Sequence, residues 1–278
     1  MPTPTLPGPL VDAGWLADHI TDVVVCDTRW YLDGRSGAAA FSAGHIPGAV
    51  FVDLDTDLSA PAGPDGRHPL PTPEAFAGAM GRLGVGHDSV VVAYDDAGGM
   101  VAGRMWWMLD ALGVACAVLD GGIDAWPGEL ELQPRQIVPT TFPVVAWPPD
   151  RFASADEVAD LAGDVRVIDA RAAERYRGEE NAVDPRFGHI PGARSAPFAA
   201  NLDGGRFKEA AELAAHYESL GIETDTPVVA YCGSGVSACV DLLALRLVGS
   251  ANTRLYVGSW SEWGGDEGRP LATGAEES

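Results

Sequence analysis

Short apolar runs alternate along this chain with segments of helical periodicity. The apolar runs are rich in valine and isoleucine, as is typical of buried parallel strands; they span 23–27, 89–94, 165–169 and 227–231. The helical patterns are rich in alanine and leucine and span 72–84, 154–164 and 209–221. This alternation predicts an α/β fold, in which helices cover both faces of a mainly parallel sheet.

The pattern occurs twice. Residues 83–98 resemble residues 220–235 without a gap, and the hexapeptide GHIPGA occurs at both 44–49 and 188–193. The strand at 23–27 and its flanking arginine likewise match the strand at 165–169. Ordered repeats of this kind indicate a duplicated domain. We therefore expect one domain over 1–129 and a second over 151–278, joined by a proline-rich linker at 130–150.

Charge and cysteine content restrict the classes of function. The 278-residue chain carries 18 Lys+Arg against 40 Asp+Glu, a net charge of −22, which disfavours nucleic acid and anionic lipid as partners. No apolar stretch is long enough for a membrane span, and the first residues lack a basic region followed by an apolar run, so we expect neither a membrane span nor a secretory signal. The four cysteines lack the spacing of a zinc site. We expect a reduced, cytoplasmic monomer with no metal and no cofactor.

Of the four cysteines, Cys232 stands in a sequence context that is typical of a reactive site. It ends the predicted strand 227–231 and is followed by a glycine-rich turn and then a helical pattern. Its counterpart in the first half is Asp95; a cysteine kept only for packing would be matched by an apolar residue. Open α/β folds place their sites at this end of the sheet. Backbone N–H groups of the turn and a helix N-terminus would favour an anion there.

The turn CGSGVS resembles the active-site loop of the two-domain rhodanese family, closest to the mercaptopyruvate sulfurtransferases. The two GHIPGA motifs, RMWWMLDALG at 104–113 and YVGSWSEWG at 256–264 carry the same resemblance. It implies two tandem rhodanese-like domains, each a mainly parallel sheet flanked by helices on both faces. By this resemblance the first domain is inactive, and Cys232 of the second is a nucleophile that carries sulfur as a persulfide.

The resemblance also implies residues for substrate binding. Arg175 and Arg186 match the two arginines that grip the substrate carboxylate, with Arg177 as a substitute for Arg186, because the spacing here is longer than in the family. A planar guanidinium suits this task, since it binds a carboxylate through two parallel hydrogen bonds. The backbone of the loop, at Gly233, Gly235, Val236 and Ser237, would bind the anionic sulfur.

A proton-transfer arrangement is the third implication of the resemblance. Ser234 matches the serine of an Asp-His-Ser group, and Asp55 and His68, both assigned to the first domain, are the candidates for its partners. A histidine held by a carboxylate can move a proton through the serine to the departing carbon. The alternative is that Asp55 and His68 only cap loops.

The loop sequence also bears on the sulfur donor. Thiosulfate-preferring rhodaneses carry CRKGVT, whereas this chain has Gly233 and Ser234 at the cationic positions. This favours 3-mercaptopyruvate, with thiosulfate as the alternative donor and cyanide, a thiol or thioredoxin as acceptor. The sequence disfavours two other classes of function. A cysteine phosphatase needs an arginine six residues after its cysteine, and this chain has Ala238 at that position. A non-catalytic binding module is disfavoured by the intact Cys232.

Overall fold

The computed structural model describes residues 4–161 and 164–275, which form two compact units. The first unit contains the chain up to Ala60, Leu70–Trp147 and Gly204–Arg206. The second contains Pro61–Pro69, Pro148–Asp203 and the chain from Phe207 onward. The boundary expected at residue 129 assigns segment 61–69, with His68, to the first domain; the structure packs this segment with the second unit.

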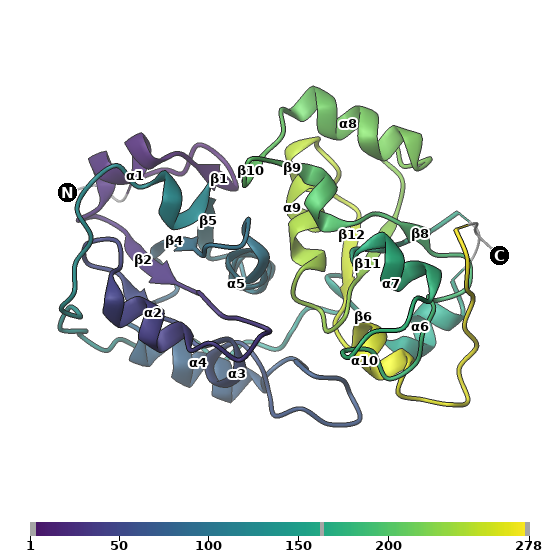
Figure 1. The fold of residues 1–278 in the computed structure, drawn as a ribbon. Coiled ribbons are helices and arrows are strands. Elements are labelled where there is room, and N and C mark those ends of the chain that lie inside the picture. The colour runs from purple at the N-terminus through teal and green to yellow at the C-terminus, as the bar shows by residue number, and fades with distance from the viewer. Residues whose placement is uncertain (1–3, 162–163, 276–278) are drawn as a thin grey trace. The chain divides into compact units, whose positions relative to one another are not determined.

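Each unit is built on a five-stranded sheet of parallel pairs (Figure 1). The strand order is β1-β5-β4-β2-β3 in the first unit and β6-β12-β11-β7-β8 in the second, so the two topologies match strand for strand. Helices flank both sheets, which confirms the predicted fold class. The duplication read from the sequence is therefore a duplication of the complete fold.

The elements of the first unit run from Leu10 to Ala125. They are β1 (Leu10–Val11), α1 (Ala13–His19), β2 (Val24–Asp27), α2 (Gly37–Ala43), β3 (Val50–Phe51), α3 (Leu54–Asp57), α4 (Pro73–Arg82), β4 (Val90–Tyr94), α5 (Met100–Ala111), β5 (Ala115–Leu119) and the 3-10 helix η1 (Gly122–Ala125).

The elements between Phe152 and Trp263 follow the same plan. They are β6 (Phe152–Ala153), α6 (Ala155–Ala159), β7 (Arg166–Asp169), α7 (Ala173–Arg177), β8 (Arg194–Ser195), the 3-10 helix η2 (Phe198–Asn201), a two-stranded sheet of β9 (Leu202–Asp203) and β10 (Arg206–Phe207), α8 (Ala210–Ser219), β11 (Val228–Tyr231), α9 (Ala238–Leu247), β12 (Thr253–Tyr256) and α10 (Ser259–Trp263).

All four strands expected from the apolar runs are present, as β2, β4, β7 and β11. The helices expected at 72–84 and 209–221 are α4 and α8. The third is shorter than expected. It begins at a capping box formed by Ser154 and Glu157 and has its C-cap at Asp160; residues 162–163 of the predicted helix lie outside the described residues.

Equivalent ion pairs hold the loops of the two units. The Arg29 guanidinium donates to Asp27 at 2.6 Å and to the carbonyl of Gly44 at 2.7 Å. In the second unit Arg171 makes the same two bonds, to Asp169 at 2.6 Å and to the carbonyl of Gly188 at 2.7 Å. These bonds tie the end of a central strand to the GHIPGA turn, so the carboxyl edge of each sheet is rigid.

Helices α5 and α9 follow directly on strands β4 and β11 and pack on the sheets (Figure 1). Both are apolar over most of their surface, and Trp106 and Trp107 of α5 are fully buried. No helix in the described part of the chain combines the length and apolarity that a membrane crossing needs.

Candidate active site

The loop 232–237 connects the end of β11 to the start of α9, at the carboxyl edge of the second sheet. Gly235 has φ +74°, a conformation that favours glycine. A side chain there would also place its Cβ 2.4 Å from the carbonyl oxygen of Val257. The glycine is thus required both for the turn and for its close packing against the residue that follows β12.

The backbone of Cys232 is fixed by the first residues of α10. The Cys232 N–H donates to Ser259 Oγ at 3.1 Å, and its carbonyl accepts from the Trp260 N–H at 3.0 Å. Ser259 is fully buried and has φ +52°, the one positive φ among the described residues other than glycine. Backbone strain of this kind persists only where the surroundings fix it. Cys232 is therefore held in one position before any ligand arrives.

The corresponding loop of the first unit shows what such a turn binds. The two carboxylate oxygens of Asp95 accept four backbone N–H groups at 2.8–3.0 Å. The donors are Ala97, Gly99, Val101 and Ala102. A carboxylate thus occupies the position equivalent to the Cys232 side chain, in a ring of donors. The turn is suited to a buried anion, as a persulfide would be.

Ser234 and His68 form a hydrogen-bonded pair beside Cys232. The distance from His68 Nδ1 to Ser234 Oγ is 2.8 Å, although 166 residues separate them in sequence. Both side chains are buried. A serine hydroxyl bonded to an imidazole can pass a proton in either direction. The sequence-based pairing of these two residues agrees with this geometry.

The third predicted member of this group, Asp55, belongs to the first unit and lies in α3. Its carboxylate accepts a hydrogen bond from the indole nitrogen of Trp30 at 3.0 Å. A role for Asp55 toward His68 stays a prediction.

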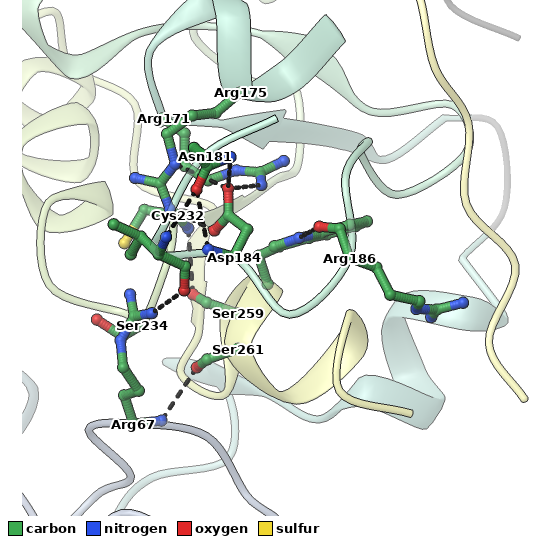
Figure 2. Close-up of polar contacts among 12 residues, drawn as sticks. Arg67, Arg171, Arg175, Asn181, Asp184, Arg186, Cys232, Ser234, Ser259 and Ser261 are labelled. Carbon is green, nitrogen blue, oxygen red and sulfur yellow. Dashed lines mark hydrogen bonds and ion pairs between the residues drawn. The ribbon is translucent and has the colours of Figure 1, made fainter. Parts of the chain in front are cut away.

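Arg175, on α7, forms an ion pair with Asp184. Its Nε donates at 2.9 Å and its Nη2 at 2.5 Å to the two oxygens of that carboxylate (Figure 2). Asp184 also accepts from Arg171 at 3.3 Å and from Asn181 at 3.1 Å. Burial raises the pKa of the Asp184 carboxyl, but the two arginines outweigh it and hold the pKa below its ordinary value. Asp184 therefore stays ionised and compensates much of the charge of Arg175.

Arg186 extends away from Cys232 in Figure 2 and is engaged elsewhere. Its guanidinium donates to four backbone carbonyls at 2.6–3.1 Å, those of Trp263, Gly264, Asp266 and Arg269. These bonds fix the segment after α10, so the structure gives Arg186 a structural role in place of the predicted substrate contact. The substitute, Arg177, is half-exposed and pairs with Glu179 at 2.6 Å.

Sequence reasoning missed a third arginine of the site, Arg67. Its Nη2 lies 2.9 Å from the position that a Cβ on Gly233 would occupy, and Nη2 of Arg175 lies 3.0 Å from the same position. The two guanidinium groups therefore converge above the first residue after Cys232. The only signal in the sequence was that Arg67 directly precedes His68; its contact with the loop depends on packing across more than 150 residues.

The remaining predicted loop residues lie where expected. Gly233 is buried and leaves room for the two arginines. Val236 is buried, and Ser237 is the N-cap residue of α9 without a side-chain capping bond. Among residues 4–161 and 164–275, no group of His, Cys, Asp and Glu side chains has the arrangement of a metal site.

Comparisons with known proteins agree with the fold. The family profile of the rhodanese-like domain matches residues 12–129 and 154–266. A probable 3-mercaptopyruvate sulfurtransferase of Pseudomonas aeruginosa is 43% identical, over 95% of this chain and 98% of that protein. The putative thiosulfate sulfurtransferase SseB of Mycobacterium tuberculosis is 41% identical, over 95% and 97%. The crystal structure of SseA, a 3-mercaptopyruvate sulfurtransferase of Escherichia coli, superimposes with a TM-score of 0.80 at 35% identity, covering 91% of this chain and 99% of that one.

Proposed function

The chain belongs to the rhodanese-like family and is a sulfurtransferase, and from this premise we propose that it transfers sulfur from 3-mercaptopyruvate through a persulfide on Cys232. The observation that carries the choice of donor is the Ser234–His68 hydrogen bond of 2.8 Å beside the nucleophile. Release of pyruvate requires protonation of carbon, and this pair can deliver the proton.

In the proposed first half-reaction the Cys232 thiolate attacks the sulfur of the substrate. A sulfur–sulfur bond forms and the carbon–sulfur bond breaks, with its electron pair going to carbon as the enolate of pyruvate. The enolate takes a proton through Ser234 and His68. Backbone N–H groups of the loop, equivalent to those around Asp95, stabilise the anionic persulfide.

In the second half-reaction an external nucleophile attacks the outer sulfur. The sulfur–sulfur bond breaks, Cys232 leaves as a thiolate, and the acceptor carries the sulfur away; with cyanide the product is thiocyanate. We propose a thiol or thioredoxin as the acceptor in the cell. The chemistry is ping-pong, because the donor product leaves before the acceptor reacts.

Thiosulfate is the second candidate donor, favoured by the name of the Mycobacterium tuberculosis relative. Measuring kcat/KM for both donors, with cyanide as the common acceptor, separates the candidates. We expect 3-mercaptopyruvate to be preferred at least about tenfold, because the loop carries no cationic side chain for a sulfonate. A preference for thiosulfate would contradict the choice of donor and leave the sulfurtransferase chemistry intact.

Removing the Ser234 hydroxyl provides a sharper test of the proton transfer. In Ser234→Ala we expect kcat for 3-mercaptopyruvate to fall about 100-fold, the lower range of general acid–base effects. The thiosulfate reaction should change by less than threefold, because its leaving group, sulfite, needs no protonation at carbon. The control is Ser219→Ala, an exposed serine in α8. An equal loss with both donors would assign Ser234 to loop structure.

A further inference from the structure

Arg67 differs from Arg171 and Arg175 in forming no ion pair with a carboxylate among the residues that the structure describes. Its Nη1 donates to the carbonyl of Val183 at 3.0 Å, and its backbone N–H donates to Ser261 Oγ at 3.0 Å (Figure 2). Its Nε is buried and has no hydrogen-bond partner among the described residues. By contrast, Arg171 and Arg175 both bind carboxylates. A half-buried guanidinium that is not directly paired with a carboxylate is costly to maintain.

The position of Arg67 adds to this cost. Its Nη2 and that of Arg175 approach the same point above Gly233, so two like charges face each other. Burial and the charge of Arg175 lower the pKa of the Arg67 guanidinium, and they outweigh Cys232 and Asp184, which act in the opposite direction. An anion placed between the two arginines would relieve the repulsion, and the missing side chain of Gly233 leaves space for it.

We propose that Arg67 is the second anion-binding residue of the active site, acting with Arg175 in the role that the sequence assigned to Arg186. The inference rests on the proposed function, because the anion would be the carboxylate of the sulfur donor. Arg67 supplies a charge that forms no ion pair with Asp184, which is already bound by Arg171 and Arg175. Its planar fork can pair with one carboxylate.

The charge balance also identifies the class of donor. Around the loop, Arg67, Arg171 and Arg175 face the two carboxylates of Asp169 and Asp184, which leaves one positive charge in excess. A single excess charge suits a monoanion such as a 2-oxo carboxylate. A dianion would bring a second negative charge, which no cation of this group balances. The pair Arg67–Arg175 is thus expected to select a small monocarboxylate.

The test is the kinetics of Arg67→Met, which keeps the length of the side chain and removes its charge. We expect KM for 3-mercaptopyruvate to rise 10- to 100-fold, the loss that follows from removing a charge-assisted hydrogen bond, with kcat changed by less than threefold. Arg67→Lys should recover part of this loss, because it restores the charge without the fork. Arg35→Met is the matched control, since it removes an exposed arginine that pairs with Asp33 and has no predicted part in substrate binding.

A binding measurement separates this inference from the proposed function. In Cys232→Ser, which cannot turn over, pyruvate is titrated by calorimetry with and without the Arg67→Met change. Weaker pyruvate binding in the double variant supports the role of Arg67 even if 3-mercaptopyruvate proves not to be the donor. Unchanged KM in both Arg67 variants, or pyruvate binding equal in the single and double variants, overturns the inference. If Arg67→Met does not fold, the Arg67→Lys kinetics decide.

Discussion

Cys232→Ser is expected to abolish sulfur transfer, with a fall in kcat on the order of 10⁴-fold or more with either donor. A serine hydroxyl is ionised far less readily than a thiol and cannot hold a transferable sulfur. The loss should be the same for 3-mercaptopyruvate and thiosulfate, because both donors would pass their sulfur to the same atom.

The fold should survive this substitution. The bonds that fix residue 232 come from its backbone, to Ser259 and Trp260, and do not involve the thiol. We expect the urea midpoint to change by an amount equivalent to less than about 1 kcal/mol, as is usual for near-isosteric changes. Mass spectrometry of the native protein after incubation with donor should show one added sulfur atom, which the variant lacks.

Cys239→Ala is the control for this experiment. Cys239 is a second buried thiol, in α9, and its sulfur lies 3.7 Å from the carbonyl oxygen of Gly235. The Cys239→Ala variant should retain turnover and should still gain one sulfur atom after incubation with donor. Retained activity in Cys232→Ser, or loss of the sulfur adduct only in Cys239→Ala, would reject Cys232 as the sulfur carrier.

The repeat made much of this fold predictable. Strands β4 and β11 were recognisable because a buried parallel strand is continuously apolar, and the mismatch of Asp95 and Cys232 then singled out one position. The geometry of the first unit explains the mismatch: the carboxyl of Asp95 is a hydrogen-bond acceptor built into the chain. In the second unit, Cys232 leaves the equivalent turn for an anion formed during the reaction.

The arginines show where prediction from sequence ended. Arg186 was predicted from its resemblance to the family motif, yet its hydrogen bonds are to carbonyls 77–83 residues away. Arg67 was missed because segment 61–69 packs with the second unit, where its backbone meets Ser261 at a separation of 194 residues. Local patterns report the faces of helices and strands. They do not report which loop is brought to which site by packing.

Asp241, a buried carboxyl in α9, is expected to have a large effect on how the stability of the protein depends on pH. It is fully buried, and its Oδ1 accepts hydrogen bonds from Asn201 at 2.7 Å and Tyr217 at 3.1 Å. Its Oδ2 has no partner among the described residues. Burial raises the pKa of this carboxyl to about 8, with Asn201 and Tyr217 opposing the shift and Asp169 adding to it. At neutral pH Asp241 is therefore largely protonated in the folded protein.

Asp241→Asn should stabilise the protein at high pH and have little effect at low pH. The folded-state pKa of Asp241 lies above the unfolded value of 3.8, so the folded state holds a proton that the unfolded state has released. The free energy of unfolding consequently decreases as the pH rises from about 4 to about 8, and it levels off above the folded-state pKa. Asparagine is neutral at every pH and places an amide donor where the protonated acid has its hydroxyl, so the variant avoids this loss.

We expect the free energy of unfolding of Asp241→Asn to exceed that of the parent protein by on the order of 2–4 kcal/mol at pH 8 and by less than about 1 kcal/mol at pH 4.5. The measurement is urea unfolding at pH 4.5, 6 and 8, followed through tryptophan fluorescence. Asp225→Asn, an exposed aspartate in the loop before β11, is the matched control and should show no such trend. A difference that stays constant across the three pH values would show that Asp241 is ionised in the folded state, held by Asn201 and Tyr217 as a carboxylate. The proton on Asp241 would then play no part in the stability of α9, the helix that follows the Cys232 loop.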